Sequence, residues 1–231
     1  GYVRSILPPP MLSPFQIETL FLPSRQLGGD CFDYFWLNPD TLIVYLLDVS
    51  GHGLGAALPS VYLLNLLRSQ SLSGVNYENH PEVLAALNRA FQMSSQDNKY
   101  FTIWYGAYHC PTQTLTFTSA GHPPALLWNP ANECQLLKTQ GFPIGLFSEA
   151  DYGSTQCFIP SGSILYLLSD GVYEVYKSDG QVWGLLSLQE LLSQCPSYHH
   201  QPLSELLKGI QTHSSSEAFM DDFSLVKVRF A

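Results

Sequence analysis

The aspartates most able to do chemistry in this sequence stand where strands are expected to end. Asp48 closes the apolar run 42–47, Asp170 follows the run 164–169, and the pair 221–222 precedes the last expected strand. A carboxylate at the tip of a buried strand loses solvation, which costs free energy unless it meets a cation. Aspartate is also a common turn residue, so this placement alone leaves a structural role open.

Several carboxylates can share one site when cations neutralise them. Oxygen ligands without histidine or thiolate partners favour Mg²⁺ or Mn²⁺ over Zn²⁺. Two such ions can bridge a water, lower its pKa and hold a phosphoryl oxygen. The sequence therefore favours hydrolysis of a phosphoester, with Asp30 and Asp33 as further acids in a glycine-rich segment.

The elements that must position these acids are expected to form hairpins with helices between them. Helices are predicted from the glycine-rich segment 51–55 to about 70, then at 81–93, 187–194 and 202–212. Strands are predicted at 15–21, 31–37, 42–47, 100–108, 115–119, 124–128, 134–138, 156–159, 163–168 and 223–230. Because the strands come in hairpins rather than in βαβ units, the fold class is α+β, with antiparallel sheets packed on each other and helices outside.

Apolar spacing predicts which sides of the first two helices are buried. The second helix should bury Leu84, Leu87 and Phe91. The first should bury Leu58, Val61, Tyr62, Asn65 and Leu66.

Composition indicates one folded domain. The chain has 231 residues, of which 45% are hydrophobic and 13% charged, and its formal net charge is −9. We expect a single domain at 15–231, preceded by 1–14 as the tail of an upstream connecting segment, because prolines 8–10 stop any arriving helix. The Gly1 start suggests a domain cut from a longer protein. The acidic balance argues against nucleic acid or an anionic membrane as partner.

Location is predicted from what the sequence lacks. No apolar run has the length of a membrane span, and there is no signal peptide. The five cysteines are scattered and form no CxxC pair, so free thiols in a reducing compartment are expected. These features predict a cytoplasmic protein.

Seven short motifs, in order, resemble the SpoIIE/RsbU-type branch of the PPM metal-dependent serine/threonine protein phosphatases. Any one of them is weak, but their order and spacing over 15–230 are specific. They lie at 25–30 (RQLGGD) with Asp33, 48–53 (DVSGHG) with 56–58, 101–102, 119–124 (SAGHPP), 143–145, 169–174 (SDGVYE) and 221–226 (DDFSLV).

The resemblance implies an α-β-β-α sandwich of two mainly antiparallel sheets flanked by helices, with two Mn²⁺ or Mg²⁺ ions at one edge. By position, Asp48 would bridge both ions and the Val49 carbonyl would be a further ligand. Asp170 and Asp221 would hold one ion, and Asp30 would bind the other, directly or through water. A metal-bridging water would attack phosphorus in line, without a phosphoenzyme. The neighbouring family position is occupied by Asp222, ranked second as a direct ligand.

Five further residues are secondary candidates. Asp33 faces away from the other acid of its segment, which predicts a place on the surface or behind the ligands. His52 could protonate the leaving oxygen or orient a metal-bound water, although its offset from the family position weakens that role. Gly51 and Gly53 should let the chain turn from strand to helix and expose amides near the site. Arg25 could meet a substrate phosphate or form an ordinary salt bridge.

Partners follow from the resemblance alone. The implied substrate is a phosphoserine or phosphothreonine on a STAS-domain anti-sigma-factor antagonist in a bacterial partner-switching pathway. An upstream sensor, such as a receiver, PAS or GAF domain, is also expected, and a homodimer is left open. The alternative is a degenerate phosphatase fold that binds a partner without turnover. A diguanylate cyclase is rejected, because Cys31 in 28–32 (GGDCF) stands where that family needs an acid.

Overall fold

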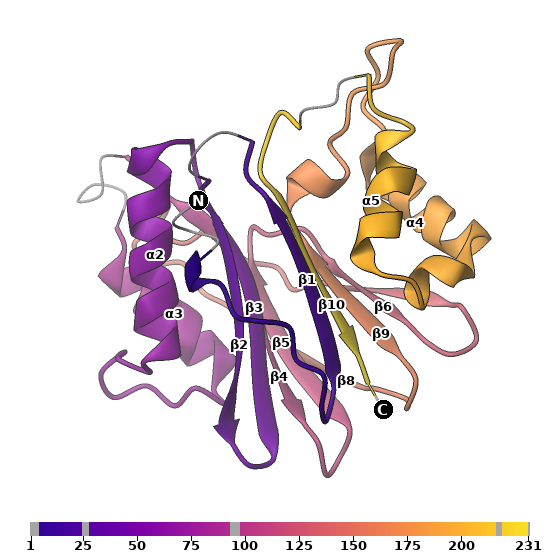
Figure 1. The fold of residues 1–231 in the computed structure, drawn as a ribbon. Coiled ribbons are helices and arrows are strands. Elements are labelled where there is room, and N and C mark those ends of the chain that lie inside the picture. The colour runs from indigo at the N-terminus through magenta and orange to yellow at the C-terminus, as the bar shows by residue number, and fades with distance from the viewer. Residues whose placement is uncertain (1–4, 25–27, 93–97, 216–218, 231) are drawn as a thin grey trace.

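Two five-stranded sheets pack face to face in the computed structural model, which describes residues 5–24, 28–92, 98–215 and 219–230 (Figure 1). All strand pairs are antiparallel. One sheet has the order β1 (Gln16–Leu22), β10 (Phe223–Arg229), β9 (Ile164–Leu168), β6 (Ala125–Trp128), β7 (Cys134–Leu137). The other has the order β2 (Asp30–Asn38), β3 (Thr41–Val49), β4 (Phe101–His109), β5 (Thr114–Ala120), β8 (Thr155–Phe158). The predicted α+β sandwich is confirmed.

Helices cover the outer face of each sheet (Figure 1). The sheet that contains β3 is covered by α2 (Leu54–Arg68) and α3 (His80–Ala90), and the other by α4 (Gly184–Gln194) and α5 (Leu203–Gln211). Two short 3₁₀ turns, η2 (Asp170–Val172) and η3 (Pro196–His199), follow β9 and α4. The predicted end of the second helix, at 93, lies outside the described residues. Within the described residues, no helix combines the length and apolar character needed to cross a membrane.

The core has three layers, because both sheets are buried on both faces. Trp104 and Leu165 lie among the side chains between the two sheets. A second cluster fills the space under α2 and α3, and a third lies under α4 and α5. Along β3, Leu46 faces the opposite sheet while Leu47 faces the helices. The uninterrupted apolar run before Asp48 therefore serves two core layers at once, as predicted for a strand buried on both faces.

The buried face of α2 differs from the predicted one, whereas the predicted face of α3 is confirmed by Leu84, Leu87 and Phe91. Leu58 and Tyr62 are 65% and 54% exposed. Apolar residues occur on both sides of this helix, so its periodicity does not separate the two faces. Small side chains decide the outcome by letting the helix approach the sheet closely. The buried residues are Ala56, Ala57, Ser60, Leu63, Leu64 and Leu67.

A pair of leucines on α2 tests this orientation. Leu64→Ala removes a fully buried side chain and should lower the free energy of unfolding by about 2–5 kcal/mol. Leu58→Ala, on the exposed side of the same helix, should change it by less than about 0.5 kcal/mol. Urea denaturation followed by circular dichroism measures both. Similar losses for the two variants would show that the helix is turned differently.

Candidate active site

Two carboxylates stand side by side where β2 begins and β3 ends. In the register of these strands Asp30 lies opposite Asp48, and β4 places Thr102 opposite Asp48 on the other side. Side chains alternate along a strand, so Asp48 shares the inter-sheet face with Leu46, and Asp30 shares it with Phe32. Opposed residues of neighbouring strands have Cβ atoms about 4.5–5.5 Å apart. The side chains of Asp30 and Asp48 therefore both point into the space between the sheets.

The facing sheet supplies the remaining acids from the ends of β9 and β10. Asp170 opens η2 just after β9, and Asp221 lies just before β10. The Ser169 hydroxyl donates to the Asp222 carbonyl at 3.0 Å and accepts from the Ser224 amide at 3.0 Å. These bonds tie the end of β9 to the start of β10, so both acidic segments reach the same edge of the sandwich.

Asp222 holds the segment that leads into β2. Its carboxylate accepts hydrogen bonds from the backbone amides of Ser24 at 2.9 Å, Gly29 at 2.7 Å and Asp30 at 3.4 Å. A Cβ on Gly28 would lie only 2.2 Å from Oδ2 of Asp222, so any side chain at residue 28 would displace this carboxylate. Asp222 therefore positions a neighbouring acid by its backbone, and its direct contact with a metal stays a prediction.

Burial and mutual repulsion raise the pKa values of the clustered carboxyl groups. Burial, followed by the charges of Asp170 and Asp221, raises the pKa of Asp48 to about 7. Burial, followed by the charges of Asp221 and Glu174, raises the pKa of Asp170 to about 6. Burial and the charge of Asp48 raise the pKa of Asp30 well above its usual range. The acids from the two sheets therefore interact as one electrostatic cluster.

The chemistry of these donors fits a hard divalent cation. The buried Oδ2 of Asp30 has no hydrogen-bond partner among the described residues. A Cβ on Gly29 would lie 2.5 Å from the Val49 carbonyl oxygen, so glycine leaves room beside that oxygen. In the parts of the chain that the structure describes, no three His, Cys, Asp or Glu side chains are arranged to hold an ion as they stand. A bound cation would have to draw the carboxylates together.

A pocket of about 200 Å³ opens beside Asp48 and Asp170. One wall is His122, whose Nδ1 lies 2.7 Å from the Thr102 hydroxyl oxygen. Burial lowers the pKa of His122 to about 3, so this wall is uncharged at neutral pH. Lys138 is the one residue with a cationic side chain among those that line this pocket, and no motif in the sequence singled it out. The lining comprises Asp48, Thr102, Gly121, His122, Pro123, Pro124, Lys138, Asp170 and Tyr173.

The glycines after β3 turn the chain toward α2, as predicted. Gly51 and Gly53 have φ values of 91° and 73°, which residues other than glycine rarely adopt. His52 between them is exposed and does not line the pocket. Its proposed part in proton transfer stays a prediction. Arg25 lies outside the described residues.

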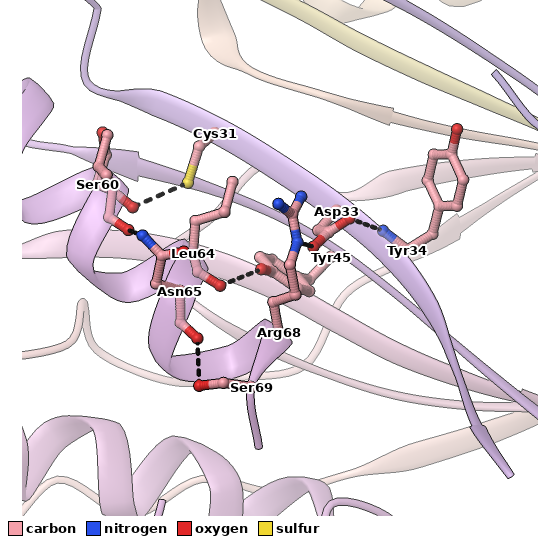
Figure 2. Close-up of polar contacts among 10 residues, drawn as sticks. Cys31, Asp33, Tyr34, Tyr45, Ser60, Leu64, Asn65, Arg68 and Ser69 are labelled. Carbon is pink, nitrogen blue, oxygen red and sulfur yellow. Dashed lines mark hydrogen bonds and ion pairs between the residues drawn. The ribbon is translucent and has the colours of Figure 1, made fainter. Parts of the chain in front are cut away.

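Asp33 is buried on the helix side of β2, away from the acid cluster. Its Oδ2 forms an ion pair with Arg68 Nε of α2 at 2.5 Å, and its Oδ1 accepts the Tyr34 amide at 2.8 Å (Figure 2). Nearby, the Cys31 thiol donates to the Ser60 carbonyl at 3.3 Å. Asp33 therefore links β2 to α2. Of the two places predicted for it, the surface is wrong, because its side chain is buried.

An antiparallel two-sheet sandwich flanked by helices is the fold of PP2C-type phosphatase domains. Solved structures agree: the SiaA-PP2C domain of Pseudomonas aeruginosa superposes with a TM-score of 0.79 at 20% identity, covering 93% of this chain and 86% of that one. The phosphatase domain of SpoIIE from Bacillus subtilis, solved with a fragment of its regulatory domain, gives 0.77 at 18% identity, over 94% and 63%.

Residues 38–231 match the family described as Stage II sporulation protein E (SpoIIE), and the chain belongs to this family. Two relatives from Bacillus subtilis (strain 168) are named phosphoserine phosphatases. RsbP is 28% identical over 98% of this chain, and RsbU is 25% identical over 95%. The chain spans only 55% and 64% of the lengths of these relatives.

The metal-free protein should lose stability as pH rises. In the folded state the pKa of Asp48 is about 7, so its carboxyl group stays largely protonated below that pH. The pKa of an aspartate in the unfolded chain is about 3.9. The folded state binds more protons between these values, so the free energy of unfolding falls across this interval. In EDTA, Asp48→Asn should therefore melt at a higher temperature than the wild type near pH 8, and the two should converge as the pH falls to about 4.

Asp40→Asn provides the control, because Asp40 is exposed on the turn between β2 and β3. Its melting temperature should follow that of the wild type at every pH. Adding Mn²⁺ near pH 8 should raise the melting temperature of the wild type and of Asp40→Asn more than that of Asp48→Asn. Equal melting temperatures for Asp48→Asn and the wild type in EDTA at pH 8 would contradict the repulsion between Asp48 and its neighbouring carboxylates.

Proposed function

We propose that the chain hydrolyses phosphoserine or phosphothreonine on a regulatory partner protein in a metal-dependent reaction. The observation that carries this proposal is the cluster of acids from two facing sheets, which raise one another's pKa values beside a small pocket. Such a cluster is costly in the absence of a cation and suited to binding one. Membership of the SpoIIE family supports the same activity.

Two Mn²⁺ or Mg²⁺ ions are proposed at the cluster. Asp48 would contact both and the Val49 carbonyl one, Asp170 and Asp221 would hold one, and Asp30 the other, with Asp222 beside them. When bound, the ions would neutralise the phosphate and lower the pKa of an attacking water.

The chain's own groups complete the pocket. The Lys138 ammonium can offset the charge of a phosphate that enters between the acids. Neutral His122 and the Thr102 hydroxyl share a hydrogen bond and form an uncharged polar wall. Burial, with the charges of Asp170 and Glu174, raises the pKa of Tyr173, so its hydroxyl stays protonated at neutral pH.

The proposed partner is a phosphorylated STAS-domain anti-sigma-factor antagonist of a partner-switching pathway. Support comes from the family resemblance and from two relatives, RsbP and RsbU, which are named phosphoserine phosphatases. An upstream sensor domain is proposed on the same basis, since those relatives are longer than this chain. A cytoplasmic location and a homodimer are further proposals.

A binding module without turnover is the second candidate. It is favoured by one observation, that no three candidate ligands among the described residues are arranged to hold an ion as they stand. The complete set of acids argues for the enzyme. Hydrolysis of p-nitrophenyl phosphate with added Mn²⁺ separates the two functions. Saturating metal without turnover would favour the binding module.

Removing one charge from the cluster should abolish activity while leaving the fold intact. Asp48→Asn and Asp170→Asn should each lower kcat roughly 100-fold or more, since the ions are worth several kcal/mol of transition-state stabilisation. Steady-state hydrolysis of p-nitrophenyl phosphate in Mn²⁺ measures this, with circular dichroism as the check on folding. Full activity in either variant would refute the metal assignment.

Asp33→Asn is the matched control, because it changes a buried aspartate on the other face of β2. Breaking its ion pair with Arg68 should lower the free energy of unfolding by about 1–3 kcal/mol. Its kcat should stay within about threefold of the wild type at a temperature where both are folded. A loss of kcat as large as that of Asp48→Asn would place Asp33 in the catalytic machinery.

A further inference from the structure

A groove of about 1140 Å³ continues from the acid pocket across the surface. Gly121 and Lys138 line both hollows, so the groove opens onto the place where a phosphate would bind. Its walls come from the segment after β7 and from the loop before β8. The lining comprises Gly121, Lys138, Thr139, Gln140, Gly141, Phe142, Phe147, Ser148, Glu149, Ala150 and Asp151.

Hydrogen bonds from the core hold both walls of this groove. On one side, the Ser119 amide donates to the Thr139 hydroxyl at 2.7 Å, and the Thr139 amide donates to the Ser119 hydroxyl at 2.9 Å. On the other, Asn88 of α3 donates to the Phe147 carbonyl at 2.8 Å and accepts the Gly145 amide at 2.7 Å. The walls are therefore preformed, which lowers the entropic cost of binding a chain between them.

Two aromatic rings make the groove apolar. Phe142 and Phe147 are 57% and 51% exposed, and their ring centroids lie 4.8 Å apart in an edge-to-face arrangement. Leaving two adjacent phenylalanines in water forgoes the burial that such side chains normally obtain. An exposed apolar pair beside a charged pocket is typical of a site that binds another molecule.

Charge constrains what can lie there. Lys138 stands at the junction with the acid pocket, where a phosphate would be, and the other charged residues of the groove are Glu149 and Asp151. Both acids are exposed. A segment with a phosphate at one point, apolar side chains next to it and a basic residue beyond would match this distribution.

We propose that the groove binds the residues that flank the phosphorylated serine or threonine of a protein substrate, with large apolar side chains against Phe142 and Phe147. This placement rests on the proposed phosphatase activity, because the phosphate must lie in the acid pocket for its neighbours to reach the groove. The groove would then select among phosphoproteins by sequence, while the acid cluster performs the same hydrolysis on each.

Two synthetic phosphoserine peptides test the proposal. One carries leucines and an arginine on both sides of the phosphoserine, and the other has serine in place of each leucine. With Mn²⁺, the wild type should show a kcat/KM roughly tenfold higher for the leucine peptide, the factor that burial of one large apolar side chain gives. The double variant Phe142→Ala/Phe147→Ala should reduce this preference to within about twofold. Each value is expressed relative to kcat/KM for p-nitrophenyl phosphate, which has no flanking residues.

Phe158→Ala is the matched control, because Phe158 is 60% exposed at the end of β8 and does not line the groove. It should keep the full preference for the leucine peptide. An equal kcat/KM for both peptides in the wild type, or a preference that survives in the double variant, would overturn the proposal. So would a dimer, seen by analytical ultracentrifugation, that the double variant alone dissociates, because the groove would then hold a second copy of the chain.

Fluorescence anisotropy in EDTA, with labelled versions of both peptides that carry serine in place of the phosphoserine, separates this proposal from the proposed activity, since it requires neither turnover nor a phosphate beside the metal-free acids. Tighter binding of the leucine peptide, lost in the double variant, would support the groove even if no phosphate ester were hydrolysed. Hydrolysis of p-nitrophenyl phosphate without any difference between the peptides, in binding or in kcat/KM, would retain the phosphatase and reject the groove.

Discussion

Repulsion among buried carboxylates is the constraint on which this structure depends. Acids carried by β2, β3 and the ends of β9 and β10 meet at one edge of the sandwich, where burial and neighbouring charges raise the pKa values of Asp30, Asp48 and Asp170. A carboxylate held there must take up a proton or meet a cation. The rest of the sandwich supplies the packing that holds the strand ends together against this repulsion, with core side chains on both faces of each sheet.

The backbone around the acids is fixed by contacts that leave little freedom. The hydroxyl of Ser169 links the end of β9 to the start of β10. The carboxylate of Asp222 accepts hydrogen bonds from two backbone amides that precede β2. A Cβ on Gly171 would lie 2.2 Å from the Asp222 carbonyl oxygen. Only glycine therefore fits at this position after β9. The motifs around Asp30, Asp170 and Asp222 therefore combine acidic residues with the small residues that let them converge.

Sequence predicted this arrangement where local rules decide it. Apolar runs that end in aspartate locate β3 and β9, because a strand buried on both faces has no polar alternation to obscure it. The face of α2 was predicted wrongly, since both of its sides are apolar and close approach through Ala56 and Ala57 decides between them. Lys138 and Phe147 could not be predicted as neighbours of the site. They are brought there by turns whose positions depend on Asn88 and Ser119, which are distant in sequence.

The pairing of β1 with β10 has a consequence for where this unit begins. These strands pair along the whole of Gln16–Leu22, and the chain's first strand therefore lies against its last (Figure 1). A truncation at residue 38, where the family match starts, would remove β1, nearly all of β2 and the acid at Asp30. It would leave β10 and β3 as uncovered edges with free amides and carbonyls, a template for intermolecular pairing. A boundary drawn from the family match alone would thus cut into both sheets, and a unit with both sheets intact must include β1 and β2.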